Sequence, residues 1–379
     1  MNWKYPVFDT RFGAAERAAV AGVVRSAWLT MGPVTQEVEA LLRERTGAAH
    51  AFLVANGTAA LEMAGEALGV GPGDEVICPT ITFVAGANAY RTAGATVVFA
   101  NSIGEHDLNL DPADVERRLT RRTKAIVVVH YAGFPANLDA ILRIARRAKV
   151  AVIEDCAHAL FSRQGGRTLG TRGDVGCFSF FSNKNVTCGE GGAVLTRSKT
   201  VAGRLRLLRS HGMTTLTLER HRGHAFDYDV ELAGHNHRID DLRAALLKVQ
   251  LQRLDGYLER RRRLFRLYCE RLQGTDVIVP FADWAGRPAL NDIGVHLMCV
   301  LLPRGKSRVK VMERLRDRRI QTSIHYPPIH LFTAYRNGVS RDLERTEDLG
   351  RRILTLPFYP RLTEAGVDEV ASALKDALA

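Results

Sequence analysis

The 379 residues are 46% hydrophobic and carry a formal net charge of +12, a size and apolar content that predict a globular protein of two domains and exclude a disordered chain. No apolar run approaches the about 18 residues that a membrane span requires, the first ten residues lack the apolar core of a signal peptide, and no nucleic-acid-binding motif accompanies the basic charge. We therefore expect a cytoplasmic protein with no membrane or nucleic-acid partner, whose excess arginines either form solvated surfaces or attract an anionic substrate.

From the N-terminus, apolar periodicity first predicts two amphipathic helices, at residues 14–27 and 34–46, separated by a Gly-Pro turn. Strand-like and helix-like segments then alternate as far as residue 154. Strands are expected at 50–55, 75–78, 95–100, 125–129 and 150–154, and helices at 58–68, 83–92, 111–118 and 137–147. This alternation predicts an α/β fold, with a parallel sheet covered by helices on both faces and joined by right-handed crossovers.

A glycine turn between the first strand and its helix, Ala55-Asn-Gly-Thr-Ala-Ala-Leu61, is the first candidate binding element. A helix that opens on glycine presents unpaired N–H groups at the positive end of the helix dipole, where a phosphate can bind. Gly57, Thr58 and Ala59 are therefore phosphate candidates. The alternative is an ordinary helix cap, made by Asn56 or Thr58.

Two acids, Glu154 and Asp155, follow the apolar residues of the strand predicted at 150–154. Because successive strand residues face opposite sides of a sheet, we expect only one of them to reach a ligand at the carboxyl edge. A carboxylate at that edge can keep the pyridinium nitrogen of a ring cofactor protonated, and we assign this role to Asp155. As the alternative, either acid could cap the following helix.

Residues 175–192 contain the chemical centre that we predict, Lys184. The apolar run that opens this segment has the length of a buried strand, and the Ser/Asn/Thr-rich loop after it would present Lys184 at the carboxyl end of that strand. A partly desolvated lysine becomes a nucleophile toward a carbonyl or pyridoxal phosphate. Gly189, Gly191 and Gly192 would let the backbone pass close to a planar ligand. A solvated surface lysine is the alternative, so the assignment depends on the residues that accompany Lys184.

The C-terminal half is predicted to contain a long loop and a long helix that leads into a small α+β domain. The loop covers residues 210–229, the strands are at 276–280, 296–302 and 321–326, and the helices are at 200–209, 238–272, 307–317 and 365–378. We therefore divide the chain into a large domain, residues 1–238, and a second unit, residues 239–379, formed by the linking helix and the small domain.

The segment His325-Tyr-Pro-Pro-Ile-His330 places two histidines near a predicted strand. His325, Tyr326 and His330 are candidates for substrate contact in the cleft, and a structural role for the histidines is the equal alternative. We expect no metal site, because no carboxylate lies at ligand spacing from these histidines and the six cysteines form no Cys-x-x-Cys pair.

In their order and spacing, these motifs resemble the DegT/DnrJ/EryC1/StrS family of sugar aminotransferases, the fold-type-I enzymes that use pyridoxal phosphate (PLP), over nearly the whole chain. Besides the segments already described, the resemblance rests on Trp28-Leu-Thr-Met-Gly-Pro33, Gly71-Pro-Gly-Asp-Glu-Val76, Pro79-Thr-Ile-Thr-Phe-Val84, Gly173-Asp-Val-Gly-Cys-Phe-Ser179, Asn236-His-Arg-Ile239 and Leu354-Thr-Leu-Pro357. Each motif alone is weak, but the set is specific. The resemblance implies a large domain on a mostly parallel seven-stranded sheet and a smaller C-terminal α+β domain.

Carried over residue by residue, the resemblance implies that Lys184 bonds to PLP and shuttles a proton from the donor's α-carbon, while Asp155 pairs with the pyridine nitrogen. Thr58, Ala59 and Ser179 would bind the phosphate of PLP, with Gly57 in the same turn. Phe83 would stack on the PLP ring, and His158 would lie near the phenolic oxygen of PLP. Asn236 would reach the phosphate of the partner subunit's cofactor, with Arg238 nearby. We therefore expect a homodimer with shared active sites and isologous contacts.

Two positions depart from the pattern of many relatives, His158 in place of glutamine and His235 in place of tyrosine. A histidine can still hydrogen-bond the phenolic oxygen of PLP, so we expect both changes to be compatible with PLP binding, and they put the substrate assignment in question. The implied reaction moves an amino group from L-glutamate or L-glutamine to a keto sugar in antibiotic or other secondary-metabolite biosynthesis, or in surface-polysaccharide biosynthesis. Because the surface is basic, we favour a nucleotide-linked keto sugar as the acceptor, with a ketocyclitol of the aminoglycoside type as the alternative.

The rival interpretations are a PLP enzyme that dehydrates or oxidises its substrate and a non-enzymatic regulator. In the dehydratase branch of the family a histidine replaces the lysine, so Lys184 argues against the first. A regulator would not need Lys184, Asp155 and the phosphate loop together, which argues against the second.

Overall fold

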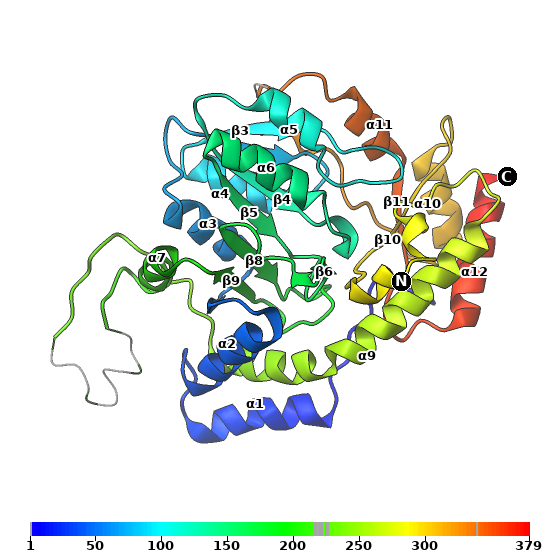
Figure 1. Cartoon of the computed structure of the whole chain (residues 1–379). Helices are drawn as coiled ribbons and strands as arrows, with labels where there is room; N and C mark the ends of the chain where they lie inside the picture. Colours follow the sequence, from blue (N-terminus) through cyan, green and yellow to red (C-terminus); the bar gives the residue numbers. More distant parts are fainter. Residues whose placement is uncertain (1, 216–217, 219–222, 224–226, 339) are drawn as a thin grey trace.

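A seven-stranded sheet forms the centre of the larger part of the molecule (Figure 1). The computed structural model describes residues 2–215, 218, 223, 227–338 and 340–379. The strands are β1 (His50–Val54), β2 (Glu75–Pro79), β3 (Thr96–Ala100), β4 (Thr123–Val129), β5 (Ala151–Asp155), β8 (Val175–Ser179) and β9 (Gly192–Thr196). Their order in the sheet is β1-β9-β8-β5-β4-β2-β3, and β9 alone runs antiparallel to its neighbours. The predicted α/β fold with a mostly parallel seven-stranded sheet is confirmed.

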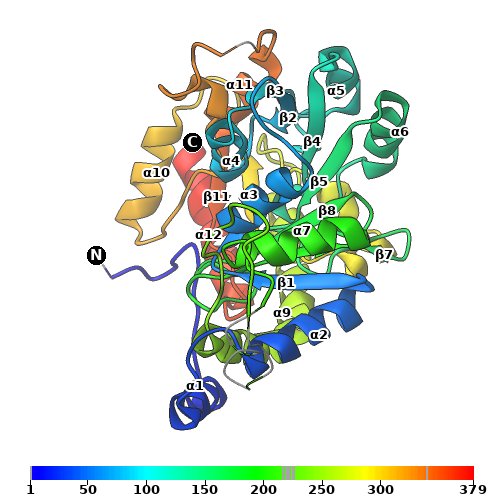
Figure 2. The same cartoon turned by 90° about the vertical axis from the view of Figure 1, so that its left-hand side faces the viewer.

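Helices cover both faces of this sheet, as the sequence alternation predicts (Figures 1 and 2). One face packs against α3 (Gly57–Ala67), α4 (Ala85–Thr92) and α7 (Lys199–Arg209), and the other against α2 (Pro33–Thr46), α5 (Pro112–Arg118), α6 (Leu138–Ala148) and the first half of α9 (Asp241–Leu272). In β4, Ala125, Val127 and Val129 belong to the first core, whereas Ile126 and Val128 belong to the second. A strand buried on both faces needs apolar residues at every position, which explains its unbroken apolar run.

The C-terminal unit is small and is tied to the sheet by α9 (Figure 1). It contains an antiparallel pair of strands, β10 (Met298–Leu301) and β11 (Ile353–Leu356), with α10 (Arg308–Asp317), α11 (Glu344–Arg352) and α12 (Glu364–Leu378). Leu247 and Leu251, early in α9, pack under the large sheet, and Phe265 and Tyr268 pack in the core of the C-terminal unit. The N-terminal helix α1 (Ala14–Ser26) packs along α9. The division between residues 238 and 239 stays a prediction.

The predicted elements up to residue 180 are confirmed with ends shifted by at most two residues, but two later strands are wrong. Residues 276–280 and 321–326 each contain a single bridge, Ile278 to Leu301 and Ser323 to Thr355. The sequence analysis also missed β9, β11, α11 and the short hairpin of β6 (Arg163–Gln164) and β7 (Arg167–Thr168). An antiparallel strand that returns between two others interrupts the strand and helix alternation, so that rhythm does not reveal β9.

The loop predicted over residues 210–229 falls partly outside the described residues. Its described ends run side by side, because the Thr214 amide donates to the Asp229 carbonyl at 2.9 Å and Met213 bridges Val230. Within the described ranges, no helix combines the length and the apolar character that crossing a membrane requires.

Candidate active site

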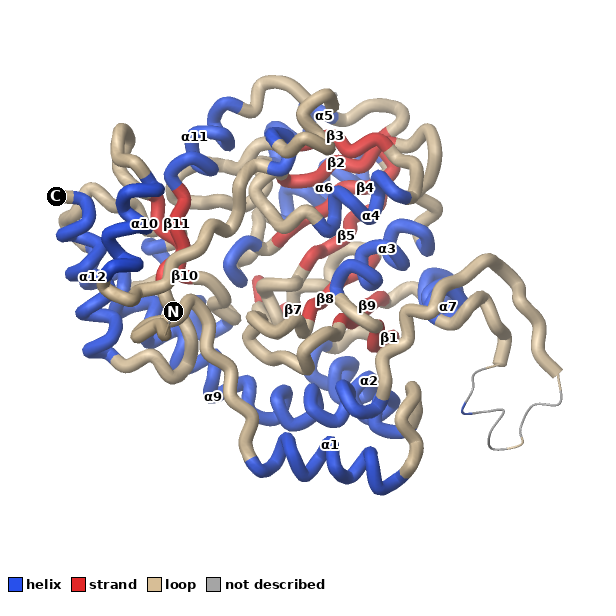
Figure 3. Tube along the Cα trace, turned by 180° about the vertical axis from the view of Figure 1, so that it is seen from behind, coloured by secondary structure: helices blue, strands red, loops and turns tan. Residues whose placement is uncertain are grey.

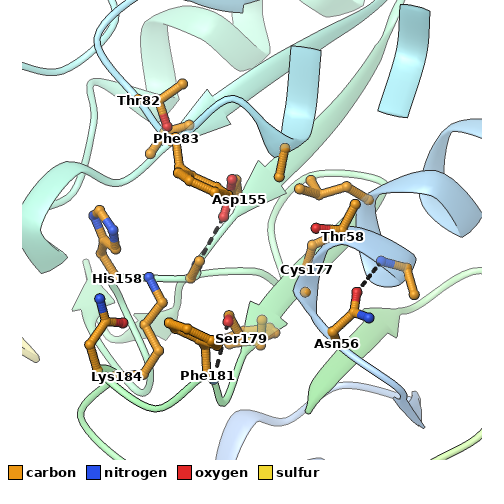
Figure 4. Close-up of a pocket in the computed structure, with 18 of the residues that line it drawn as sticks. Asn56, Thr58, Thr82, Phe83, Asp155, His158, Cys177, Ser179, Phe181 and Lys184 are labelled. Carbon is orange, nitrogen blue, oxygen red and sulfur yellow. Dashed lines mark hydrogen bonds between the residues drawn. The ribbon is translucent and has the colours of Figure 1, made fainter. Parts of the chain in front are cut away.

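A cavity of about 530 Å³ opens at the carboxyl ends of β5 and β8 and reaches the N-terminus of α3 (Figure 4). The predicted residues that line it are Gly57, Thr58, Ala59, Phe83, Asp155, His158, Ser179, Lys184, His325 and Tyr326. The fold therefore brings together residues that are up to 269 positions apart in the sequence, as in other α/β proteins whose ligands bind at the carboxyl edge of a sheet.

The alternation of β5 explains why Asp155 faces this cavity. Ile153, two residues earlier, packs in the core beneath α3, and Asp155 shares its face of the strand. Glu154, between them, points to the opposite face. In β8, Cys177 and Ser179 follow the same alternation and also line the cavity. The two strands thus direct polar side chains to one place without any irregularity.

The carboxyl group of Asp155 is buried, with 9% of the residue exposed, and accepts a hydrogen bond from the Ala157 amide at 2.9 Å. Burial raises the pKa of Asp155 above its usual value, although the Ala157 bond and the positive charge of Lys184 oppose that rise. A buried carboxyl group that faces a cavity with so little hydrogen bonding favours a cationic or protonated partner there.

Glu154 has the opposite environment. Its two oxygens accept hydrogen bonds of 2.6–2.8 Å from three backbone amides within residues 170–173 and lie 3.1 Å from His130 Nε2. Burial alone would raise the pKa of Glu154, but His130 and these amides outweigh burial and hold the pKa below its usual value. Ligand atoms of His130, Glu154 and Cys156 lie within 4.8 Å of one another, but the N–H donors already engage Glu154. This cluster is structural.

Lys184 lies in the turn after β8, where its amide donates to the Phe181 carbonyl at 2.9 Å. The side chain is half-buried, and its amine points into the cavity on the side of His158 (Figure 4). Burial lowers the pKa of Lys184 to about 8, while the carboxylate of Asp155 acts in the opposite direction. A substantial fraction of the amine is therefore neutral near physiological pH, as a nucleophile and a base require.

The N-terminus of α3 forms the other end of the cavity. Asn56 caps the helix by accepting a hydrogen bond from the Ala59 amide at 2.9 Å, so the predicted alternative of an ordinary cap is present. The amides of Gly57 and Thr58 precede the first intrahelical bond and are free of that cap. A Cβ at Gly57 would lie 2.9 Å from Ser179 Cβ, so only glycine lets the turn approach Ser179. This turn fits a phosphate.

His158 is held as a neutral ring. Its Nδ1 accepts a hydrogen bond from the Ala132 amide at 3.4 Å, which places the proton on Nε2, and Nε2 lies 3.1 Å from the Tyr326 hydroxyl. Burial lowers the pKa of His158 well below the usual histidine value. His325 is also held neutral, because burial lowers its pKa to about 4. The structure therefore surrounds the Lys184 amine with uncharged imidazoles.

Three predicted residues do not line the cavity of their own protomer. Asn236 is exposed and pairs with Ser210 in an antiparallel bridge, and Arg238 follows it on the same extended segment. His330 is a correction. Its Nδ1 lies 2.7 Å from the Thr80 hydroxyl and its Nε2 lies 3.1 Å from Glu347, and these two contacts hold the ring outside the cavity.

Several cavity residues were missed by the sequence analysis, namely Glu62, Thr82, Phe181, Asn183, Glu190 and His237. Glu62 could have been found, because it lies one helical turn after Thr58 on the same face of α3. His237 Nε2 lies 3.3 Å from Glu62. His296, whose ring centre is 4.7 Å from that of His158, had no signal in the sequence, since only the fold brings it near.

The fold and the cavity together define a class of enzyme. The glycine turn at Gly57 suits a phosphate, the buried and sparsely bonded Asp155 suits a protonated ring nitrogen, and the Lys184 amine suits an aldehyde. The residues present therefore fit PLP in a fold-type-I transferase. The chain belongs to the DegT/DnrJ/EryC1/StrS aminotransferase family, whose model matches residues 11–375.

Comparisons with individual proteins agree. The chain is 36% identical to the spore coat polysaccharide biosynthesis protein SpsC of Bacillus subtilis over 373 residues, which are 96% of this chain and 94% of that protein. It is similar to the aminotransferase TlmJ from Streptoalloteichus hindustanus, with a TM-score of 0.90, 35% identity and coverage of 99% and 98% of the two chains. The PLP-form of Spr1654 from Streptococcus pneumoniae, described as a putative sugar aminotransferase, has a TM-score of 0.89, 27% identity and coverage of 100% and 98%. The protein is a PLP-dependent aminotransferase.

Proposed function

We propose that this aminotransferase moves the amino group of L-glutamate or L-glutamine to a keto sugar, in secondary-metabolite (antibiotic) or surface-polysaccharide biosynthesis. The observation that carries the proposal is the meeting of Lys184, Asp155 and the N-terminus of α3 in one cavity. Two relatives support the sugar substrate, since one is named for spore coat polysaccharide biosynthesis and one is described as a putative sugar aminotransferase.

The proposed roles follow from the position of each side chain. PLP, when bound, supplies an electron sink for the carbon that loses its proton. The neutral amine of Lys184 takes the proton from the donor's α-carbon and returns one at the acceptor carbon, while Asp155 holds the proton at the ring nitrogen. Gly57, Thr58, Ala59 and Ser179 would hold the phosphate and Phe83 would cover the ring. The Nε2–H of His158, which lies 3.1 Å from the Tyr326 hydroxyl, would donate to the phenolic oxygen of PLP in place of that hydroxyl.

The acceptor that we favour is a nucleotide-linked keto sugar, which the net charge of +12 would attract. A specific observation supports the second candidate, a ketocyclitol. Among the described residues no arginine lines the main cavity, and Glu62 and Glu190 do. Carboxylates accept hydrogen bonds from hydroxyl groups but repel a diphosphate, so the diphosphate of a nucleotide would have to lie away from Glu62 and Glu190. His325 and Tyr326 are the proposed acceptor contacts. A comparison of kcat/KM for the two acceptor types decides between them.

We also propose a homodimer in which Asn236 and Arg238 of each chain reach the partner's cavity. The proposal is supported by the position of the segment at the surface of its own protomer's cavity, where the His237 carbonyl accepts a bond of 2.8 Å from the Ala55 amide and Asn236 is exposed. The test is to mix Lys184→Ala with Asn236→Ala. If sites are shared, mixed dimers contain one intact site and activity returns. If each chain works alone, the mixture stays as inactive as its components.

The first experiment is a visible spectrum of the protein with PLP, before and after excess glutamate or glutamine. We expect a visible band that the donor bleaches as its keto acid is released, no turnover in Lys184→Ala, and wild-type behaviour in Lys375→Ala, an exposed lysine of α12. A band that neither donor changes would exclude both proposed donors. A protein that forms no band would exclude the assignment of Lys184.

A further inference from the structure

A second, smaller cavity of about 70 Å³ adjoins the main one. Residues 8–11, α9 and residues 360–361 form its walls, and it shares Asn183 and Lys184 with the main cavity. Figure 3 shows the N-terminal segment running past α9 toward α1. Lys184 therefore borders two spaces, of which the proposed reaction uses only the larger.

Arg261 of α9 lines the small cavity and is 3% exposed. Its Nη1 donates to the carbonyls of His296, at 3.1 Å, and Phe358, at 3.2 Å. Within the described part of the chain, no carboxylate pairs with Arg261, and its Nε is buried without any hydrogen-bond partner. Both carbonyl bonds go to Nη1, so among the described residues no hydrogen bond engages the edge of the guanidinium formed by Nε and Nη2.

A buried guanidinium without an anion is costly, because two carbonyl bonds and the Phe358 ring, whose centre lies 5.2 Å from the guanidinium carbon, replace only part of the solvation that the charge loses. Burial lowers the pKa of Arg261 to about 9, so the group still carries its charge at neutral pH. A carboxylate would offset this cost, since its two oxygens match the two parallel N–H groups of a guanidinium edge.

The other lining groups add to the positive potential. Arg11 and Arg361 also border the small cavity, and Asp9, at 3.3 Å from Arg361, is the one carboxylate among its described lining residues. At the junction of the two cavities, the Asn183 carbonyl oxygen is buried without a partner and can accept a hydrogen bond from an ammonium group. The small cavity thus favours an anion, and the junction favours an N–H donor.

We propose that the small cavity binds a carboxylate of the amino donor, with Arg261 as the main contact and Arg11 and Arg361 in support. This would place the donor's amino group near Asn183 and its reacting carbon beside Lys184. The inference rests on the proposed function, which names glutamate or glutamine as the donor. Either carboxylate of glutamate, the α or the γ, could bind Arg261 in this way. Glutamine has only the α-carboxylate, because its side chain ends in an amide, so a comparison of the two donors identifies which carboxylate binds.

The experiment compares three variants as holoenzymes. Arg261→Lys keeps the charge and removes the paired N–H groups, Arg361→Gln removes an outer charge, and Arg318→Gln is the control. Arg318 and Arg361 are matched, because their side chains are 52% and 51% exposed and each pairs with an aspartate. We would follow the donor half-reaction in single turnovers with each donor, taking its maximal rate as kcat and its half-saturating donor concentration as KM, and measure the Kd of glutarate by calorimetry.

We expect Arg261→Lys to raise the donor KM and the glutarate Kd by about tenfold and to change kcat by less than about threefold. Arg361→Gln should raise both constants by about threefold, and Arg318→Gln should leave them unchanged. A rise in KM for both donors would assign the α-carboxylate to the cavity, and a rise for glutamate alone would assign the γ-carboxylate.

Unchanged KM and Kd in a folded Arg261→Lys variant, judged by its melting temperature and its PLP band, would overturn the proposal. If that variant does not fold, the double variant Arg11→Gln/Arg361→Gln replaces it, and unchanged constants there would overturn the proposal equally. A wild type that reacts with neither donor would contradict the proposed donors instead, and its glutarate binding would still test the cavity.

Discussion

Glu154 and Asp155 are neighbours in the sequence and both are buried, but the fold gives them opposite environments. Glu154 accepts hydrogen bonds from three amides and lies against His130, whereas Asp155 accepts one from the Ala157 amide. The pKa of Glu154 is correspondingly lowered and that of Asp155 is raised, chiefly by burial. The comparison teaches that a buried carboxylate whose oxygens accept several hydrogen bonds from the protein stabilises the fold. A buried carboxylate that accepts few such bonds and faces a cavity indicates a ligand site.

The difference also separates stability from activity. Replacing Glu154 removes the acceptor of three amides, one buried and two partly buried, whereas replacing Asp155 removes only that of the Ala157 amide. In the folded protein Asp155 accepts only one hydrogen bond. A protonated ring nitrogen would donate a second hydrogen bond and provide a positive charge beside the carboxylate. Variants at the two positions should therefore show opposite phenotypes.

The largest expected effect is on the activity of Asp155→Asn. An asparagine keeps the shape but cannot hold a positive charge at the ring nitrogen, so we expect the donor half-reaction to slow by about 10³-fold, equivalent to about 4 kcal/mol in the barrier. Urea unfolding of the cofactor-free protein should show no loss of stability, because a buried charge has been removed. A half-reaction rate within tenfold of the wild type would contradict this role for Asp155.

Glu154→Gln should reverse that pattern. Its side-chain NH₂ group would face N–H donors, so we expect the free energy of unfolding to fall by about 2–4 kcal/mol. The rate per folded molecule should stay within about threefold of the wild type, because Glu154 points away from the cavity. Urea unfolding and active-site titration measure the two quantities. A stability loss no larger than that of Asp155→Asn would show that the hydrogen-bond count does not distinguish these acids.

The same comparison predicts pH dependences of opposite sign. The folded pKa of Asp155 is raised, so its contribution to stability is full below the unfolded pKa of about 3.9 and is lost as pH rises through the folded value. The folded pKa of Glu154 is lowered, so its contribution is present above about 4.3 and is lost as pH falls through the folded value. With rising pH, Asp155→Asn should therefore gain stability relative to the wild type, and Glu154→Gln should lose it. Urea unfolding from pH 3 to 7 tests this, and slopes of equal sign would contradict it.

How much the sequence predicts depends on whether a feature is local. The strand alternation of β5 was enough to expect that Glu154 and Asp155 face opposite sides, because parity along a strand is a local property. The position of Lys184 at the carboxyl end of a strand is equally predictable, because an apolar run indicates the strand and the polar residues after it indicate a loop. These residues lie within a few positions of the elements that place them.

Features that depend on packing between distant segments could not be predicted. Nothing near Arg261 in the sequence indicates a buried guanidinium, since the arginines around it read as a solvated helix face. His330 was predicted to be a candidate for the cleft, but contacts with Thr80 and Glu347, each from another element, hold it elsewhere. The positions of such side chains are decided by tertiary contacts that a single sequence does not display.

The smallest expected effect is that of His158→Gln, which introduces the residue that the family resemblance predicts at this position. The Nε2–H of His158 and the amide NH₂ of glutamine are both neutral donors, so kcat/KM should change by less than about threefold. Because burial lowers the pKa of His158 well below the usual value, its ring does not titrate between pH 6 and 8. The pH profiles of the wild type and the variant should coincide in this range. His158→Ala, which has no donor, should weaken PLP binding by about tenfold, or about 1.4 kcal/mol. The contrary outcome is an inflection near pH 6.5 that the wild type shows and His158→Gln lacks. It would show that His158 becomes charged during the reaction and that the cavity does not keep this histidine neutral.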